Sequence, residues 1–346
     1  MDEDVIMVCM ENTFNHTELE KWYQANHRAL PFRESQNPYF IWVIEIMAQQ
    51  TQMETVVPYF ERFIRRYPTV QDLANTDSDT LHKMVEGIGY YRRFQHMHEA
   101  AKIIVSTYNG IFPTTHETVL SLPGVGEYTA GAIMSIAYNK PYAATDGNVI
   151  RVLSRFFRIF DDMRTPKARR IIAELNQKLI IEATPHIYTQ AIMELGALVC
   201  RPQNPLCESC PLRSSCAAYK DQLTAVLPVI SPQKRPTIIH YTTLIIEHQN
   251  KIALLKKEEG LLKGMYLFPQ FEDRSIEAIS KILEASGFQV NEITKLKNYR
   301  HVFTHTIWSM SVYKIGINEI PDGSPYTFFD EITSLPMAIA HRKIKF

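Results

Sequence analysis

The 346-residue chain carries 37 basic and 37 acidic residues, and this balance excludes a protein that binds polyanions through bulk charge. The hydrophobic content of 45% can form a sizeable core, and the length indicates two or three domains. Neither a long apolar run nor a basic leader followed by an apolar stretch occurs, so we expect no membrane span and no signal peptide. The few, mostly clustered cysteines favour a reducing cytoplasm and a metal site over a disulfide framework.

Charge is unevenly distributed along the chain. The first twenty residues hold six acids and no Lys or Arg, whereas residues 21–220 hold 22 basic against 18 acidic residues. This excess is small, so nucleic-acid binding would have to come from local basic patches.

The first strong helix pattern surrounds a lone acid. After a short helix at 17–28, Asn37-Pro38 breaks the chain, and a helix begins at Tyr39 with apolar residues at helical spacing. Glu45 lies within it, between Ile44 and Ile46. An apolar neighbourhood raises the pKa of a carboxyl group and keeps it protonated for general acid catalysis. The alternative is a solvated Glu on the outer face of the helix.

A glycine turn follows further helices. We expect helices at 55–66, 78–86 and 91–108, with the polar cluster 49–52 available for contacts with bases or sugars. The turn 87–91 carries two glycines and two tyrosines and precedes Arg92-Arg93. Aromatic and basic residues on a turn suit base stacking and phosphate contact, with buried core tyrosines as the alternative.

A second glycine turn lies at Leu122-Pro-Gly-Val-Gly126. Its two glycines precede a helix-forming run, and backbone N–H groups at a helix start bind anions. Asp146 follows closely downstream. Two carboxylates and an anion-binding turn suit cleavage of a glycosidic bond, in which one acid protonates the leaving group and the other carboxylate faces the sugar. On DNA, the turn would hold the backbone while the nucleotide is flipped out.

Four cysteines lie close together after three more helices. The helices are expected at 148–160, 167–182 and 186–199, and the first carries a basic stripe that reads as a solvated face or a phosphate contact (Arg151, Arg155 and Arg158). Cys200, Cys207, Cys210 and Cys216 then form a compact, proline-containing loop. Four thiolates can bind either zinc or an iron–sulfur cluster, and the spacing leaves both open.

The periodicity changes after a linker. Residues 227–236 contain three prolines. Paired strands are predicted at 241–247 and 251–257, a helix at 275–285, and a strand with two-residue alternation at 303–315. We therefore expect a helical N-terminal part joined to an α+β domain of 110 residues, 237–346.

Motifs along residues 20–220 occur in the order found in one family. The chain resembles the helix-hairpin-helix DNA glycosylases with a Gly/Pro-Asp loop, and among them the adenine DNA glycosylases of the MutY type. The resemblance rests on seven stretches: Leu30–Arg33, Ile41–Thr51, Gly87–Tyr91, Leu122–Gly126, Thr145–Val149, Met193–Cys200 and the four-cysteine loop.

The resemblance implies a division of catalytic roles. Glu45 would protonate adenine at N7 and later handle the attacking water, and Asp146 would stabilise the cationic sugar. Tyr128 and Asn148 would assist around these two carboxyl groups. Relatives that cleave the DNA strand carry a Schiff-base lysine where this chain has Tyr128, which argues for a monofunctional enzyme.

The same resemblance implies a cofactor and contacts with DNA. Cys200, Cys207, Cys210 and Cys216 would bind a [4Fe-4S] cluster. Residues expected to contact DNA or the two bases are Arg33, Gln50, Thr51, Ile88, Tyr90, Gly124, Val125 and Gly126.

The C-terminal domain resembles a Nudix-like module that recognises 8-oxoguanine. Gly260–Pro269 looks like the glycine-aromatic segment of that module, while the acid-rich signature of Nudix hydrolases is absent from 275–287. Phe303, Thr304 and His305 would contact the lesion. Thr304 replaces the usual Ser, and Ile44 and Ala48 replace a common Ser and Leu beside the catalytic helix.

These observations predict a multidomain fold, with an all-α helix-hairpin-helix glycosylase domain followed by an α+β Nudix-like domain. The catalytic domain would span 1–226, with a six-helix barrel lobe at about 31–140, an iron–sulfur lobe from 1–30 and 141–226, and a cluster loop at 200–216. We expect a monofunctional adenine glycosylase that acts as a monomer on double-stranded DNA with adenine opposite 8-oxoguanine or guanine, in the bacterial cytoplasm at the nucleoid. The alternatives are an endonuclease III-like glycosylase/lyase and a non-catalytic iron–sulfur DNA-binding protein.

Overall fold

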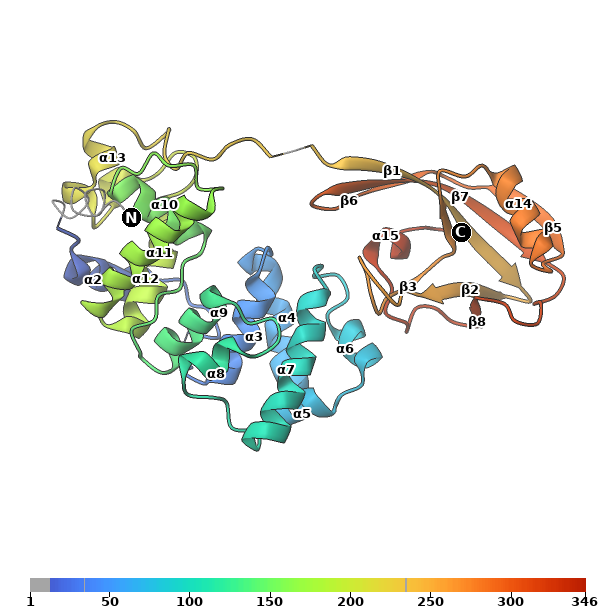
Figure 1. Cartoon of the computed structure of the whole chain (residues 1–346), viewed down its shortest axis with the longest axis horizontal. Helices are drawn as coiled ribbons and strands as arrows, with labels where there is room; N and C mark the ends of the chain where they lie inside the picture. The colour runs from blue at the N-terminus through green and yellow to red at the C-terminus, as the bar shows by residue number, and fades with distance from the viewer. Residues whose placement is uncertain (1–12, 34, 234) are drawn as a thin grey trace. The chain divides into compact units, whose positions relative to one another are not determined.

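The computed structural model describes residues 13–33, 35–233 and 235–346 (Figure 1). These form two compact units. The first holds the described residues up to Asn75 together with His96–Pro232, and the second holds Thr76–Gln95 together with the described residues from Gln233 to Phe346.

The first unit is helical. Its elements are α2 (His16–Asn26), α3 (Pro38–Ala48), α4 (Met53–Arg66), α5 (Val70–Asn75), most of α7 (Arg92–Tyr108), α8 (His116–Leu120), α9 (Glu127–Ala132), the π-helix η1 (Ile133–Ala137), α10 (Gly147–Phe156), α11 (Pro166–Ile181), α12 (Pro185–Leu198), the short 3₁₀ helices η2 (Cys207–Ser209) and η3 (Arg213–Ser215), and α13 (Ala217–Lys220). Most of the predicted helices lie within a few residues of these bounds, although the helix predicted at 148–160 ends at Phe156, and α5 and α8 were not predicted.

Helix α3 illustrates how local sequence sets these elements. The Asn37 side chain accepts a hydrogen bond from the Tyr39 N–H, and Pro38 occupies the first turn, where its missing N–H costs nothing. Every residue from Ile41 to Met47 is buried, so the helix lies in the core on all sides and carries Glu45 with it. A solvated outer-face position for Glu45 is thereby excluded.

Helices α10, α11 and α12 share a second core with the N-terminal helix α2. This core includes Leu19 of α2, Leu153 of α10, Ile172 of α11 and Ile192 of α12, all fully buried. The chain therefore returns after Ala143 to pack against α2, and the predicted lobe boundaries stay a prediction.

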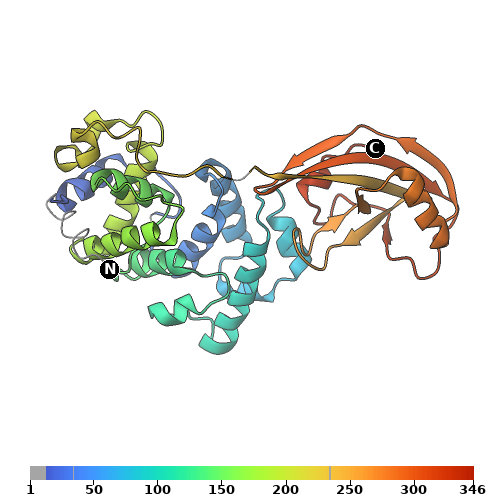
Figure 2. The ribbon, with the colours of Figure 1, turned by 45° about the horizontal axis from the view of Figure 1, so that its top comes forward.

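The second unit contains α6 (Ser78–Met84) and a sheet. The strands are β1 (Thr237–His248), β2 (Lys251–Lys256), β3 (Tyr266–Leu267), β4 (Gln270–Glu272), β5 (Val290–Lys295), β6 (Tyr299–Val302), β7 (Thr306–Ile317) and β8 (Thr327–Phe329), and the helices are α14 (Ile276–Ala285) and α15 (Ile339–Arg342). The long strands β1 and β7 are parallel neighbours in the middle of the order β3-β2-β1-β7-β5 (Figure 2).

The predicted hairpin at the start of this unit is confirmed. Strands β1 and β2 are antiparallel, and the turn residues Gln249 and Asn250 have φ values of 47° and 65°. A left-handed backbone conformation at both turn positions matches the twist of the strands that a two-residue hairpin joins. Helix α14 covers one face of the sheet through Ile279 and Leu283, which pack with Leu244 and Ile315. No helix in the described ranges is long and apolar enough to cross a bilayer.

Candidate active site

A buried acid and a phenol meet in the helical unit. The Tyr128 hydroxyl, on the first turn of α9, donates a 2.5 Å hydrogen bond to Oε2 of Glu45. Glu45 is 8% exposed. Burial raises the pKa of Glu45 to about 7, with a further rise from the Asp146 charge, while the Tyr128 hydrogen bond opposes the shift. Near neutral pH this carboxyl group is therefore partly protonated and can donate a proton.

Asp146 begins helix α10. Its Oδ1 accepts the Val149 N–H at 2.8 Å, which caps the helix, and its Oδ2 accepts the Asn148 side-chain amide at 2.8 Å. Burial raises the pKa of Asp146, whereas these hydrogen bonds favour the charged form. Both oxygens are thus oriented by the start of α10, and the carboxylate is placed close enough to Glu45 to influence its pKa.

Asn148 is itself positioned from α12 and α10. Arg151 donates to the Asn148 Oδ1 at 2.7 Å and to the Gly196 carbonyl at 2.8 Å. A methyl group at Gly196 would lie 2.6 Å from the Asn148 Cβ, so a residue without a side chain is needed there. The Asn148 amide is held in the orientation in which its NH₂ group donates to Asp146.

The basic stripe on α10 is largely internal, contrary to the expected solvated face or phosphate contact. Arg151 donates to the Cys200 carbonyl at 2.7 Å. Arg155 is 2% exposed and donates to the carbonyls of Arg201 at 2.7 Å and Leu227 at 2.8 Å. Arg158 lies on the surface in an ion pair with Asp221. Two of these three side chains therefore fix the cysteine loop to α10, a role that i, i+4 spacing alone does not reveal.

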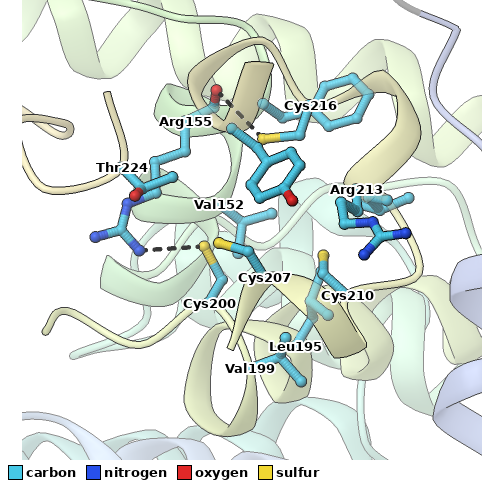
Figure 3. A pocket seen from close by; sticks show the side chains of 13 residues that line it. Val152, Arg155, Leu195, Val199, Cys200, Cys207, Cys210, Arg213, Cys216 and Thr224 are labelled. Carbon is cyan, nitrogen blue, oxygen red and sulfur yellow. Dashed lines mark hydrogen bonds between the residues drawn. The ribbon is translucent and has the colours of Figure 1, made fainter. Parts of the chain in front are cut away.

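The four cysteines line one pocket. Cys200, Cys207, Cys210 and Cys216 lie around it with Val152, Leu195 and Val199 (Figure 3). Arg155 Nη1 donates to the Cys200 Sγ at 3.4 Å, and the Cys216 Sγ donates to the Arg155 carbonyl at 3.8 Å. Burial raises the pKa of the Cys210 thiol to about 12 and also raises that of Cys216.

This donor set fits a thiophilic metal centre. Four sulfur ligands prefer zinc or iron–sulfur clusters, and the positive charge of a metal would offset the burial that disfavours thiolates here. In the described part of the chain, no group of three or more His, Cys, Asp or Glu side chains is already arranged to hold a metal ion. The four thiols line the same pocket.

Arg33 has an internal partner. Its Nη1 and Nη2 atoms bind both oxygens of Glu194, at 2.8 and 2.6 Å, and Arg28 binds the same carboxylate through its backbone N–H and guanidinium. Burial by itself would raise the pKa of Glu194, but the hydrogen bonds from the two arginines lower it to about 2. The structure places Arg33 in this buried network, and its predicted contact with DNA stays a prediction.

The predicted hairpin connects α8 and α9. Gly124 has a φ of 76°, and a Cβ there would lie 2.7 Å from the His96 Cβ. Val125 is buried and its N–H donates to the Leu122 carbonyl, while Gly126 precedes α9. The fold thus makes a tight turn at 122–126, as predicted, and its anion-binding role stays a prediction.

Gln50 and Thr51 follow α3, and Gln50 is exposed with a φ of 58°.

In the second unit, two sets of residues that are predicted to contact bases lie next to each other, the turn with Tyr90 and the loop 303–305. Phe303, Thr304 and His305 form the loop between β6 and β7, and the Tyr90 hydroxyl lies 2.8 Å from the Thr304 Oγ1. Tyr90 is 46% exposed. Ile88 is only 5% exposed and Tyr91 only 6%, so one tyrosine of the turn points outward while Ile88 and the other tyrosine are buried.

Three positioning residues were missed from the sequence. Arg151, Glu194 and Gly196 orient the predicted site residues, yet each acts through a partner distant in sequence. Glu194 and Gly196 stand in the Met193–Cys200 motif, which is the one signal that could have indicated them.

Comparisons with known proteins identify the families that the two parts of the chain match. The HhH-GPD superfamily base excision DNA repair protein family matches residues 43–178, and the NUDIX domain family matches 241–345. An adenine DNA glycosylase of Buchnera aphidicola is 34% identical, over 89% of this chain and 87% of its own length. The adenine DNA glycosylase of Rattus norvegicus is 42% identical, over 94% of this chain and 76% of its own length.

Solved structures show the helical fold. A thermostable thymine-DNA glycosylase superimposes with a TM-score of 0.55 at 24% identity, covering 63% of this chain and 100% of that chain. A trapped endonuclease III–DNA covalent intermediate gives a TM-score of 0.51 at 24% identity, covering 64% of this chain and 99% of that chain. With the family matches, this confirms the predicted helix-hairpin-helix glycosylase domain followed by a Nudix-like domain. The chain belongs to the adenine DNA glycosylases, the N-glycosylases of base excision repair.

Proposed function

We propose that this protein releases adenine opposite 8-oxoguanine or guanine in duplex DNA by monofunctional hydrolysis. The observation that carries the proposal is the buried Glu45, with a pKa of about 7 and a hydrogen bond from Tyr128, beside the helix-capping Asp146. A proton donor beside a carboxylate is the pair of groups that glycosidic bond cleavage requires, which supports the proposal.

In the proposed reaction, Glu45 gives its proton to N7 of the flipped adenine. The bond between C1′ and N9 breaks, its electron pair leaves with the adenine, and C1′ becomes cationic. The Asp146 carboxylate, oriented by Asn148 and the Val149 N–H, stabilises this cation. Water then adds to C1′, and Glu45 accepts the proton that the water releases.

The absence of strand cleavage follows from Tyr128. A Schiff base needs an amine nucleophile, and the residue at this position offers a phenol that hydrogen bonds to Glu45. The product would be an abasic site in an intact strand.

We propose that Phe303, Thr304 and His305 read the base opposite the adenine. Their loop is fixed at both ends, because the Phe303 N–H donates to the Thr306 carbonyl at 2.8 Å and the Thr237 N–H donates to the His305 carbonyl at 3.0 Å. Thr304 and His305 are exposed, as a base contact requires. Gln50, Thr51, Tyr90 and the turn 124–126 would contact the DNA around the two bases.

We further propose a [4Fe-4S] cluster on Cys200, Cys207, Cys210 and Cys216. When bound, such a cluster supplies iron–thiolate bonds that cross-link the loop. The four thiols line one pocket, and Arg151 and Arg155 already fix the surrounding backbone to α10. Four iron atoms per chain, lost in Cys210→Ser, would support this assignment, whereas stoichiometric zinc without iron would contradict it.

The function is tested by base release under single-turnover conditions. Duplexes carry adenine opposite 8-oxoguanine, guanine or thymine, and each product is examined with and without alkali. We expect adenine release that is fastest opposite 8-oxoguanine, with strand breaks only after alkali. Light scattering should show one protein chain per duplex. Breaks without alkali would establish a lyase instead.

Matched variants assign the two carboxyl groups. Glu45→Gln and Asp146→Asn should each abolish release while duplex binding persists, and Glu61→Gln, on the exposed face of α4, serves as the control. If either active-site variant turned over like the wild type, the assigned mechanism would be wrong.

A further inference from the structure

A segment distant in sequence belongs to the C-terminal unit. Residues 76–95 hold α6 and the turn with Tyr90, and they form one compact body with the described residues from Gln233 onward. Glu86, just after α6, binds Arg342 of α15 through two hydrogen bonds, Nε to Oε1 at 2.7 Å and Nη2 to Oε2 at 3.2 Å. The side chains are 14% and 28% exposed, so this bidentate pair is shielded more than a surface ion pair.

Further contacts surround the Glu86–Arg342 pair. The Lys83 Nζ donates to the Glu86 Oε2 at 2.8 Å and to the Thr333 carbonyl at 2.5 Å. The Arg342 Nη1 donates to the Ile332 carbonyl at 2.9 Å. The Glu86 carboxylate therefore lies between two cations that also donate to backbone carbonyls at 332–335.

The glycine-aromatic segment contacts His82 of α6. Gly264 has a φ of 84°, and a Cβ there would lie 2.5 Å from the Cε1 of His82, which is 2% exposed. The Gln95 Nε2 donates to the Lys263 carbonyl at 2.6 Å. The module lacks the acidic signature of a hydrolase, so the segment Gly260–Pro269 needs another role. Its contacts with His82 and Gln95 give it a structural one.

Only a short stretch of chain lies between Glu86 and Tyr90, the residue that contacts the loop 303–305. Three residues separate Glu86 from Tyr90, and the Gly87 N–H donates to the Tyr91 hydroxyl at 3.0 Å. The Tyr90 hydroxyl then meets the Thr304 Oγ1 at 2.8 Å. A shift of Glu86 must therefore move Tyr90 relative to the loop 303–305.

We propose that Glu86 and Arg342 are positioning residues for recognition of the base opposite adenine. Their ion pair, with the Gly264–His82 contact, holds the turn at 87–91 so that Tyr90 and Thr304 act as one surface. The proposal rests on the proposed reading of 8-oxoguanine by this unit. The property at stake is discrimination between 8-oxoguanine and guanine, and neither residue touches the reacting atoms.

The test is a double-mutant cycle on the full-length protein. Glu86→Gln, Arg342→Gln and the double variant are compared by the ratio of single-turnover rates of adenine release opposite 8-oxoguanine and opposite guanine. Each single variant should lower the ratio about three- to tenfold, and the double variant no further, because coupled residues are not additive. Lys314→Gln, which breaks the 2.8 Å pair with Glu247 in the same unit, is the control and should keep the wild-type ratio.

A second readout does not depend on catalysis. Hydrogen exchange of the backbone amides at 87–93 should accelerate in Arg342→Gln and in Gly264→Ala, but not in Lys314→Gln, and Arg342→Lys should restore part of the protection. A wild-type ratio in the single variants, additive losses in the double variant, or unchanged exchange would each overturn the proposal. If the wild type itself shows no preference for 8-oxoguanine, the proposed function fails, and exchange alone decides whether the Glu86–Arg342 pair holds the turn. Thermal melting identifies a variant that does not fold, in which case Glu86→Gln and Gly264→Ala carry the test.

Discussion

Arg33 and Glu194 form a bidentate ion pair between the loop after α2 and helix α12, although they lie 161 positions apart in the chain. Arg28 binds the same carboxylate, whose side chain is 1% exposed. The pair joins the loop that precedes α3, the helix of Glu45, to the helix that carries Gly196 beside Asn148. It therefore connects the segments that carry the two parts of the candidate active site.

Glu194→Gln should destabilise the protein by about 3 kcal/mol at pH 7, since removing one partner leaves buried charge without its counterpart. The pKa of Glu194 is about 2 in the folded protein, below its ordinary 4.5, so its contribution is present above pH 4.5 and is lost as the pH falls towards 2. Urea denaturation of both proteins at several pH values measures this. Glu18→Gln, from an exposed pair with Lys21, is the control, and a difference that grew below pH 4.5 would contradict the assignment.

Tyr128→Phe should move the pH dependence of base release. The Tyr128 hydrogen bond lowers the pKa of Glu45, so its removal raises that pKa further above about 7. A general acid with a higher pKa stays protonated to higher pH, and the alkaline limb of the rate profile should shift upward. Single-turnover rates between pH 5 and 9 give the profile. Tyr138→Phe is the control, because the Tyr138 hydroxyl donates to the Phe112 carbonyl and not to Glu45. The alkaline limb of its rate profile should match that of the wild type.

Glu45→Gln should make the protein more stable in mild alkali while it abolishes activity. The pKa of Glu45 is about 7 in the folded protein against an ordinary 4.5, so ionisation favours the unfolded chain as the pH rises through this range. Relative to the wild type, the variant should gain up to about 3 kcal/mol at pH 8 and almost nothing at pH 4. Denaturation at these two pH values measures the gain. Equal stability of variant and wild type at pH 8 would show that Glu45 titrates normally.

Gly196→Ala should lower base release by about 10- to 100-fold, because a displacement of about 1 Å at a reacting group can cost this much. The added methyl group would lie 2.6 Å from the Asn148 Cβ and displace the amide that orients Asp146. Gly147→Ala is the steric control, since a Cβ there meets no atom within 4 Å, and it should keep most of the activity. The rates of the two variants, with duplex affinity measured in parallel, decide the point.

The sequence predicts those structural features that depend on interactions between neighbouring residues. The Asn37-Pro38 start of α3, the capping Asp146 and the Gln249–Asn250 turn lie where short-range rules place them. Glu45 could be singled out because an acid within an apolar helix is rare. The close spacing of four cysteines indicated a shared pocket, since a loop this short keeps its thiols together.

Partners distant in sequence could not be read in the same way. The stripe of Arg151 and Arg155 has the spacing of a solvated face, and the fold of the 196–227 segment supplies carbonyls that bind it. The contact of Tyr90 with Thr304 spans 214 residues. The π-helix at 133–137 and the parallel pairing of β1 with β7 likewise depend on tertiary packing, which outweighs intrinsic preference.

The order of synthesis gives the parallel strands a consequence for folding. β1 cannot complete its pairing with β7 until residue 316 has left the ribosome, and Arg342 follows later still. The segment 76–95 is made long before, so during translation it must wait for its partners while the helices around it can already fold. A nascent chain stalled before β7 would thus lack both the parallel partner of β1 and the Arg342 that binds Glu86, and these contacts of the second unit would form only after translation of residue 342.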